Sequence, residues 1–245
     1  MNAPQTGDTW RVAALTMMTP EELRAAIGGN DAGTWVAAAA ACGIAEAQLR
    51  LGRMLLAGEG VARDLPAAFV CFLAAAKSGA PEALNMLGRA YENGWGTRVN
   101  FPAAAAQYTV AAEAGLDWAQ YNLGHLLLNG AGVARDPVAA FAWYGKAAAQ
   151  GHARAMNLTG RCRENGWGVT RDPAAARAWY RSSALGGYFR GAYNYATILA
   201  AEGCIAGARY WFSDALIRAP EPTCRHMRAA LAKHVNPALR ALAGL

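Results

Sequence analysis

The side chains best suited to metal chemistry in this chain of 245 residues are four histidines and five scattered cysteines. Cys224 and His226, together with His234, could supply three ligands, but their spacing matches no standard zinc site. Sequence motifs of the form GxSxG, SxxK, HExxH and GxxxxGKS/T, which mark nucleophile, zinc and phosphate sites, do not occur. We therefore expect no catalytic residues, no metal site and no cofactor.

A second candidate for chemistry is the segment ENGWG, which begins at Glu92 and again at Glu164, 72 positions later. The duplication could reflect a catalytic loop or a structural unit that was built more than once. Related segments, NGAGVARD and AGEGVARD, stand halfway between the two copies and one step before the first. The unit thus recurs every 36 residues, a period typical of helical solenoids. We therefore interpret ENGWG as a turn, with Trp95 and Trp167 lining it or lying at its edge.

Glycines confirm the period because they recur at matching positions of successive units. We interpret them as structural residues of the repeat, and they form three columns: Gly52, Gly88, Gly124 and Gly160; Gly58, Gly94, Gly130 and Gly166; and Gly60, Gly96, Gly132 and Gly168.

The third unit shows what each repeat should form. Asp117 precedes apolar residues at helical spacing, which predicts a first helix from Asp117 to about Asn129 that ends at a left-handed Gly130. Asp136 and Pro137 then read as an N-cap and a first helical position, so a second helix should run to about Gln150. The same capping position recurs at Asp64, Asn100 and Asp172.

Aromatic residues also fall into columns on the second helices, and we expect them to be core residues. One column holds Phe72, Tyr108, Tyr144 and Tyr180, and another holds Trp143 and Trp179. The cysteines are odd in number and form no CxxC pair, so we expect buried, reduced thiols rather than a disulfide framework.

These columns of glycine, alanine and aromatic residues in 36-residue units resemble the Sel1-like repeat, a relative of the tetratricopeptide repeat with a longer turn between its helices. The resemblance covers about Gly43 to Ala219. It implies an all-α fold: a right-handed α/α superhelical solenoid of about five 36-residue helix-turn-helix repeats with helical caps. It also implies an interaction scaffold or adaptor as the function.

We expect three parts along the chain. Residues 1–43 form an N-terminal helical cap and a degenerate half-repeat, in which Thr19 to Glu22 form a capping box that opens a helix to about Ile27. Residues 44–219 form five repeats, at about 44–79, 80–115, 116–151, 152–187 and 188–219. Residues 220–245 form a C-terminal capping helix, which we expect from Thr223 to about Leu242.

Composition narrows the function. Hydrophobic residues make up 54% of the chain, which favours a folded protein, and the formal net charge of +6 is carried mostly by arginine. Arginine suits recognition of carboxylates and phosphates. The N-terminus lacks the pattern of a signal peptide and no stretch is apolar enough to span a membrane, so we expect a cytoplasmic protein without a membrane partner.

In a solenoid of helical hairpins, the first helices usually line the concave face, so their residues outside the core are the candidate binding surface. One column of this face reads Arg53, Arg89, His125 and Arg161, and stacking would turn it into a basic ladder. We therefore expect an acidic segment of a partner protein or peptide to bind at Arg53, Arg89, Trp118, Tyr121, His125, Arg154, Asn157, Arg161, Arg190 and Tyr193.

Two alternatives stay open at this point. Arg89 could pair with Glu92 and Arg161 with Glu164, which would leave an ordinary solvated helix face. The chain could also bind nucleic acid, because its C-terminal segment carries Arg218, Arg225, Arg228, Lys233 and Arg240. Scarce lysine and glutamates near the groove favour a protein partner. The sequence names neither the partner nor the oligomeric state.

Overall fold

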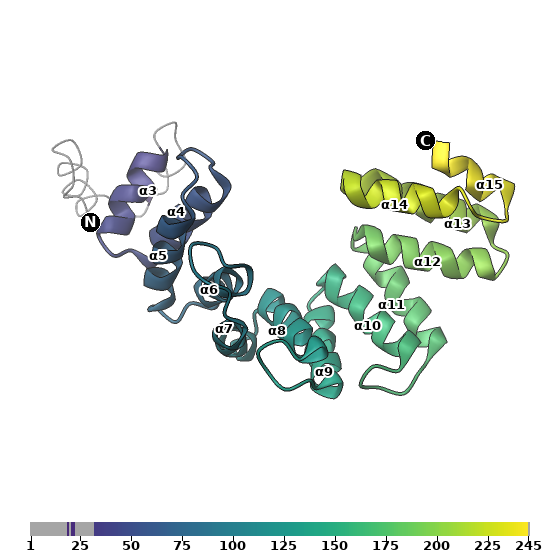
Figure 1. The fold of residues 1–245 in the computed structure, drawn as a ribbon, viewed down its shortest axis with the longest axis horizontal. Coiled ribbons are helices and arrows are strands. Elements are labelled where there is room, and N and C mark those ends of the chain that lie inside the picture. The colour runs from purple at the N-terminus through teal and green to yellow at the C-terminus, as the bar shows by residue number, and fades with distance from the viewer. Residues whose placement is uncertain (1–18, 20, 23–31, 245) are drawn as a thin grey trace. The chain divides into compact units, whose positions relative to one another are not determined.

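A computed structural model describes residues 19, 21–22 and 32–244, and within these residues the chain is helical and contains no strand (Figure 1). The all-α fold and its helix-turn-helix repeats are thereby confirmed. The helices are α3 (Ala32–Ala41), α4 (Ala45–Ala57), α5 (Leu65–Ala76), α6 (Pro81–Asn93), α7 (Phe101–Glu113), α8 (Asp117–Asn129), α9 (Pro137–Ala149), α10 (Ala153–Asn165), α11 (Pro173–Leu185), α12 (Phe189–Ala201), α13 (Ile205–Arg218), α14 (Glu221–Leu231) and α15 (Pro237–Arg240), followed by the 3-10 helix η1 (Ala241–Gly244).

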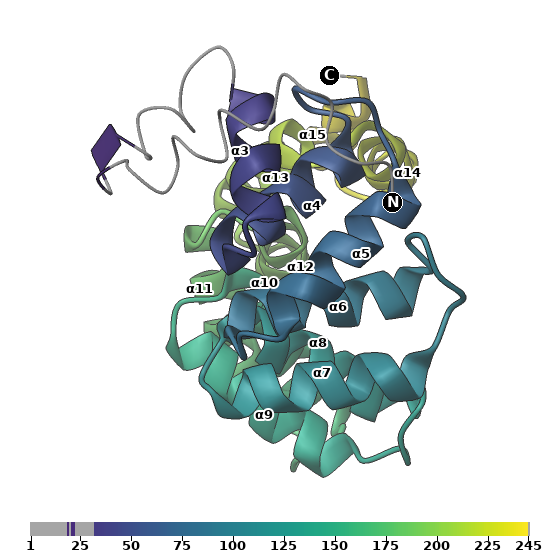
Figure 2. The same ribbon diagram turned by 90° about the vertical axis from the view of Figure 1, so that its left-hand side faces the viewer.

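The chain divides into two compact units. The first unit contains residues 1–119 and 131–133, and in it α4 packs on α5 and α6 on α7, as Figure 2 shows. The second unit contains residues 120–130 and 134–245, and in it α10 packs on α11 and α12 on α13. In both units a first helix therefore forms a hairpin with the second helix that follows it in sequence.

The second helix of each of four repeats, namely α5, α7, α9 and α11, begins with the expected cap. The side-chain oxygen of the capping residue accepts a hydrogen bond from the backbone N–H three positions later, which satisfies one of the free donors of the first turn. The N–O distances lie between 2.9 and 3.0 Å for Asp64, Asn100, Asp136 and Asp172. The capping residue's own N–H returns to a carbonyl near the end of the first helix, as from Asp136 to Leu127 at 2.9 Å.

The two turn glycines differ in what fixes them. Gly166 has φ +76° and ends α10 in the left-handed conformation that favours glycine, but a Cβ there would meet only ordinary contacts, at 3.7 Å or more. Gly168 has φ +69°, and a Cβ there would overlap the carbonyl of Pro137 at the start of α9. Gly166 therefore serves the turn within a repeat, whereas Gly168 serves the contact between one repeat and the preceding one.

The first glycine column, of Gly52, Gly88, Gly124 and Gly160, lies inside the hairpin. In each repeat the helical glycine lies against the ring of the buried aromatic residue on the second helix, so a Cβ at Gly124 would lie 2.6 Å from the Tyr144 ring. Equivalent pairs are Gly52 with Phe72, Gly88 with Tyr108 and Gly160 with Tyr180. These rings are at most 1% exposed, so the expectation of core aromatics is confirmed for this column.

Two local expectations, on the tryptophan column and on the cysteines, need correction. Trp143 and Trp179 are half-buried and not fully buried core residues, and the Lys146 ammonium lies 3.8 Å from the Trp143 ring centre. Cys42 and Cys204 are exposed, whereas Cys162 is buried and burial raises its pKa to about 11.

The C-terminal segment is not one helix from Thr223 to about Leu242. It forms α14, α15 and η1, because the side chain of Asn236 caps a new helix by accepting from Ala238 N–H at 2.9 Å, with Pro237 in its first position. At the other end, the capping box at Thr19 and Glu22 forms as expected, while the rest of the helix expected there, to Ile27, lies outside the described residues.

Candidate functional site

We call the ten residues expected to bind a partner the first-helix face. The structure places three of them, Arg53, Arg89 and Trp118, in the first unit and the other seven in the second. Arg53, Trp118, Arg154, Arg161 and Arg190 are exposed, whereas Asn157 is buried and Arg89, Tyr121, His125 and Tyr193 are half-buried. The face therefore combines accessible guanidinium groups with aromatic rings that also belong to the packing.

The arginines of the two ENGWG repeats are held in the same way. The guanidinium of Arg89 lies 5.0 Å from the centre of the Trp95 ring, and that of Arg161 lies 5.0 Å from the Trp167 ring. A guanidinium over an indole face is a favourable cation–π arrangement, which restricts the arginine without removing its charge. The tryptophan of ENGWG thus positions the arginine of the first-helix face.

The glutamate of each ENGWG segment binds elsewhere. Glu92 accepts a hydrogen bond from the Tyr108 hydroxyl at 2.6 Å, and Glu164 accepts one from Tyr180 at 2.5 Å. Burial raises the pKa of both tyrosines above the ordinary value, and the glutamates add to the rise. The ion pairs that the sequence left open as an alternative, of Glu92 with Arg89 and of Glu164 with Arg161, do not form in the part of the chain that the structure describes.

The other repeats change both partners of this contact. The first repeat has Leu56 where ENGWG repeats have glutamate, and its aromatic residue is Phe72, which has no hydroxyl. The third repeat has Leu128 with Tyr144, and the fully buried Tyr144 hydroxyl has no hydrogen-bond partner among the described residues. Burial raises the pKa of Tyr144 as well.

An aromatic cluster takes the place of arginine in the third repeat. The Tyr121 hydroxyl lies 3.2 Å from His125 Nε2, and the Tyr121 ring lies 5.0 Å from the ring of the buried His152. The expected basic ladder is therefore interrupted at His125 by a side chain that contacts the core.

A pocket of about 510 Å³ lies in the second unit between α10, α12 and α14. Four residues of the first-helix face, Asn157, Arg161, Arg190 and Tyr193, line it together with Asn194. The remaining lining comes from Thr223, His226 and Met227 of α14. We call it the C-terminal pocket, and its lining carries two arginines and no carboxylate.

A second cleft, of about 330 Å³, lies in the first unit between α4 and α6. Arg53 lines it, but Glu46 and Glu82 do so as well. The two sites lined by the first-helix face therefore differ in charge. The first-unit cleft has two glutamates and one arginine, whereas the C-terminal pocket has two arginines.

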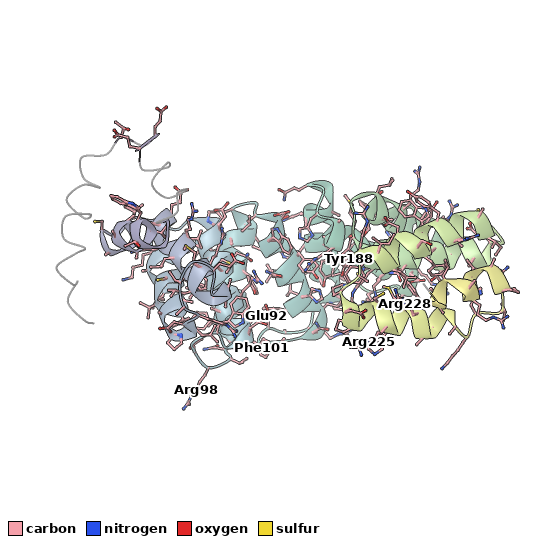
Figure 3. The ribbon with its side chains drawn as sticks, turned by 90° about the horizontal axis from the view of Figure 1, so that it is seen from above. Glu92, Arg98, Phe101, Tyr188, Arg225 and Arg228 are labelled. Carbon is pink, nitrogen blue, oxygen red and sulfur yellow. The ribbon has the colours of Figure 1, made fainter. Side chains whose placement is uncertain are left out.

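The C-terminal arginines that could have bound nucleic acid are mostly engaged. Arg218 pairs with Asp214 at 2.8 Å, Arg225 with Glu221 at 3.7 Å, and Arg240 donates to the Val235 carbonyl at 3.3 Å. Arg225 and Arg228 both project from α14, as Figure 3 shows. The carboxylates of Asp214 and Glu221 therefore offset two of the five positive charges that the sequence places here.

The residues considered for metal binding have other contacts. The Cys224 thiol is buried and donates to the Leu216 carbonyl at 3.5 Å, and His226 Nδ1 lies 2.6 Å from the Pro222 carbonyl. In the described ranges no three metal-ligating side chains come together. No described helix is both long and apolar enough to cross a bilayer.

The sequence interpretation missed two groups of residues. Arg63, Arg135 and Arg171 donate from Nε to carbonyls at the end of the first helix, at 3.2, 3.0 and 2.9 Å, and their recurrence before the capping aspartate was the signal. It also missed the α14 residues of the C-terminal pocket, for which no repeat pattern exists.

Comparison with known families matches the Sel1 repeat model to residues 45–79, 81–116, 119–152 and 153–188. No curated protein matches the chain. Among solved structures, a Sel1 repeat protein from Oxalobacter formigenes is 25% identical, with a TM-score of 0.76 over 87% of this chain and 90% of that one.

A protective antigen present in uropathogenic Escherichia coli strains, which displays the Sel1-like repeat fold, is also 25% identical, with a TM-score of 0.68 over 86% of this chain. The chain spans about half of that structure, 48% of its length. An immunity protein from Pseudomonas aeruginosa shares the fold at 18% identity and a TM-score of 0.54, covering 81% of this chain and 74% of its own.

Proposed function

Since the chain belongs to the Sel1 repeat family, whose members are generally protein–protein interaction scaffolds, we propose that it is a non-catalytic scaffold that binds a segment of a partner protein on its first-helix face. Within each unit the bound segment contacts the first helices, which pack on the second helices. No cofactor takes part.

One observation carries this proposal: Arg89 and Arg161 are held over tryptophan rings without being neutralised. A cation–π contact stabilises the fold and restricts the guanidinium, and it leaves the positive charge available to a ligand. The glutamate of each ENGWG segment is bound to a buried tyrosine and does not neutralise the guanidinium, which remains able to bind a carboxylate of another molecule.

A protein partner is favoured over nucleic acid. The C-terminal arginines are mostly engaged by carboxylates or carbonyls, and Glu46 and Glu82 line the first-unit cleft with Arg53. Carboxylates beside the arginines would repel a phosphate backbone, whereas a protein segment can match both signs of charge.

A pull-down of the tagged full chain from its native cells, read by mass spectrometry, tests the proposal. We expect a partner protein to be captured by wild type and lost from the variant Arg53→Glu/Arg89→Glu/Arg161→Glu. The matched control is Arg98→Glu/Arg181→Glu/Arg209→Glu, which makes the same charge change at exposed positions outside the first-helix face, such as the turn residue Arg98 in Figure 3.

Circular dichroism must show that both variants are folded. Equal capture by all three proteins would reject the first-helix face as the binding surface. Recovery of nucleic acid without a protein partner would reject the scaffold function.

A further inference from the structure

We propose that the C-terminal pocket, which the non-repeat helix α14 completes, is a selectivity site that binds aspartate or glutamate side chains of a partner's acidic segment. This inference rests on the proposed function, because it specifies what part of the partner segment the second unit recognises.

The first argument is the charge of the lining. Arg161 of α10 and Arg190 of α12 both line the pocket, and among the described residues neither forms an ion pair with a carboxylate. The one carboxylate near Arg161 in sequence, Glu164, is bound to the Tyr180 hydroxyl. Two accessible guanidinium groups thus face one pocket with no internal counter-charge, which favours an anionic ligand.

A second observation shows that guanidinium groups gather beside this pocket. Burial raises the pKa of Tyr188, which lies at the N-terminal end of α12 and is labelled in Figure 3, while Arg190, Arg154 and Arg161 oppose the rise. Three arginines from two successive first helices therefore act on the same tyrosine ring. Two of these three arginines, Arg161 and Arg190, also line the pocket.

The neutral lining residues suit carboxylate oxygens. Asn157 lines the pocket and is 3% exposed, and its side-chain oxygen accepts a hydrogen bond from Asn194 at 2.8 Å, which leaves its NH2 group outside that bond. Thr223 adds a hydroxyl, whereas His226 Nδ1 lies 2.6 Å from the Pro222 carbonyl and is used in that contact. Carboxylates accept hydrogen bonds from all of these donor types, with arginine the strongest.

Size and origin point to a peptide segment. A volume of about 510 Å³ is that of a site for a sizeable ligand, not for a single small ion. The α10 and α12 walls belong to the surface that is proposed to carry the partner, whereas α14 lies outside the repeat pattern. Selectivity is therefore added by the residues after the last repeat. The first-unit cleft, with Glu46 and Glu82 beside Arg53, lacks this preference.

Fluorescence anisotropy of a labelled peptide tests the inference on the purified full chain. The probe is hexaglutamate with an amidated C-terminus, so that all its carboxylates are side chains, and hexaglutamine of the same design is the neutral control. We expect Arg161→Gln and Arg190→Gln each to weaken hexaglutamate binding about tenfold, the effect of one lost charge-assisted hydrogen bond.

The matched control is Arg181→Gln on the exposed side of α11, outside the first-helix face, and it should not change the affinity. Thr223→Trp, which fills the pocket from α14 and leaves both arginines in place, should also abolish binding. The inference is overturned if wild type does not bind hexaglutamate, if Arg181→Gln weakens binding as much as Arg161→Gln, or if a hexathymidylate strand binds more tightly than the peptide.

This experiment and the pull-down can fail separately. If a partner is captured while hexaglutamate does not bind, the scaffold function stands and the pocket assignment fails. If hexaglutamate binds in the pocket while no partner protein is captured, the pocket assignment stands and the scaffold function fails.

Discussion

Removing a hydroxyl should have opposite effects at Tyr180 and Tyr144, although both lie in the second unit and differ in sequence by one repeat. Tyr180 donates to Glu164 at 2.5 Å, whereas the Tyr144 hydroxyl is fully buried without a partner among the described residues. A hydrogen bond to a charged group contributes about 1.5–3 kcal/mol, and an unsatisfied buried hydroxyl costs about 1–3 kcal/mol.

Tyr180→Phe should therefore lower the free energy of unfolding by about 1.5 kcal/mol, near the low end because the exposed Glu164 regains water. Tyr144→Phe should leave this free energy unchanged or raise it by about 1 kcal/mol. Urea unfolding followed by far-UV circular dichroism measures both.

A double variant, Tyr180→Phe/Glu164→Leu, reproduces the pair of Phe72 and Leu56 in the first repeat and should recover most of the loss. Equal destabilisation by Tyr144→Phe and Tyr180→Phe would refute the assignment of the hydrogen bond as the reason for glutamate in ENGWG.

Three further predictions concern the repeat itself. Gly166→Ala should lower the free energy of unfolding by roughly 1–2 kcal/mol, because alanine is strained in the left-handed conformation. Gly168→Ala should lower it by about 1–3 kcal/mol more, because the added Cβ overlaps Pro137. Equal shifts in the urea midpoint would contradict the inter-repeat role of Gly168. Asp136→Ala should cost about 1 kcal/mol through the lost cap, and Asp136→Asn should cost less; identical unfolding curves for wild type and Asp136→Ala would exclude the cap as a stabilising contact. Burial raises the pKa of Tyr108, Tyr144 and Tyr180 above the ordinary value of 10. Their contribution to the free energy of unfolding is therefore complete below pH 10 and is lost above it, by about 1.4 kcal/mol per tyrosine and pH unit. A free energy of unfolding that stays constant from about pH 9 to about pH 11 would argue against their burial.

The repeat could be predicted from the sequence because its signals are local. A capping aspartate, a left-handed glycine and a proline at the first helical position each act within a few residues, and the period shows that they recur. Even the break between α14 and α15 is marked by Asn236 and Pro237, a cap signal that the prediction of one long helix overlooked.

The binding surface was harder to predict because it depends on contacts between helices. Helical spacing placed Arg161 and Asn157 on one face, but it could not show that Glu164 turns to Tyr180, sixteen positions away, instead of to Arg161. Nor could it show that Asn157 is buried, or that α14 covers one side of the same face.

Site-specific photo-crosslinking tests the central claim, that the first helices carry the partner, most directly. A benzoylphenylalanine at Trp118 or Arg154 samples the first-helix face, and one at Val138 or Leu185, each 65% exposed, samples the second helices. With the captured partner present, we predict adducts from the two first-helix positions and none from the two second-helix positions. Adducts from the second-helix positions alone, or equally from all four, would contradict the account.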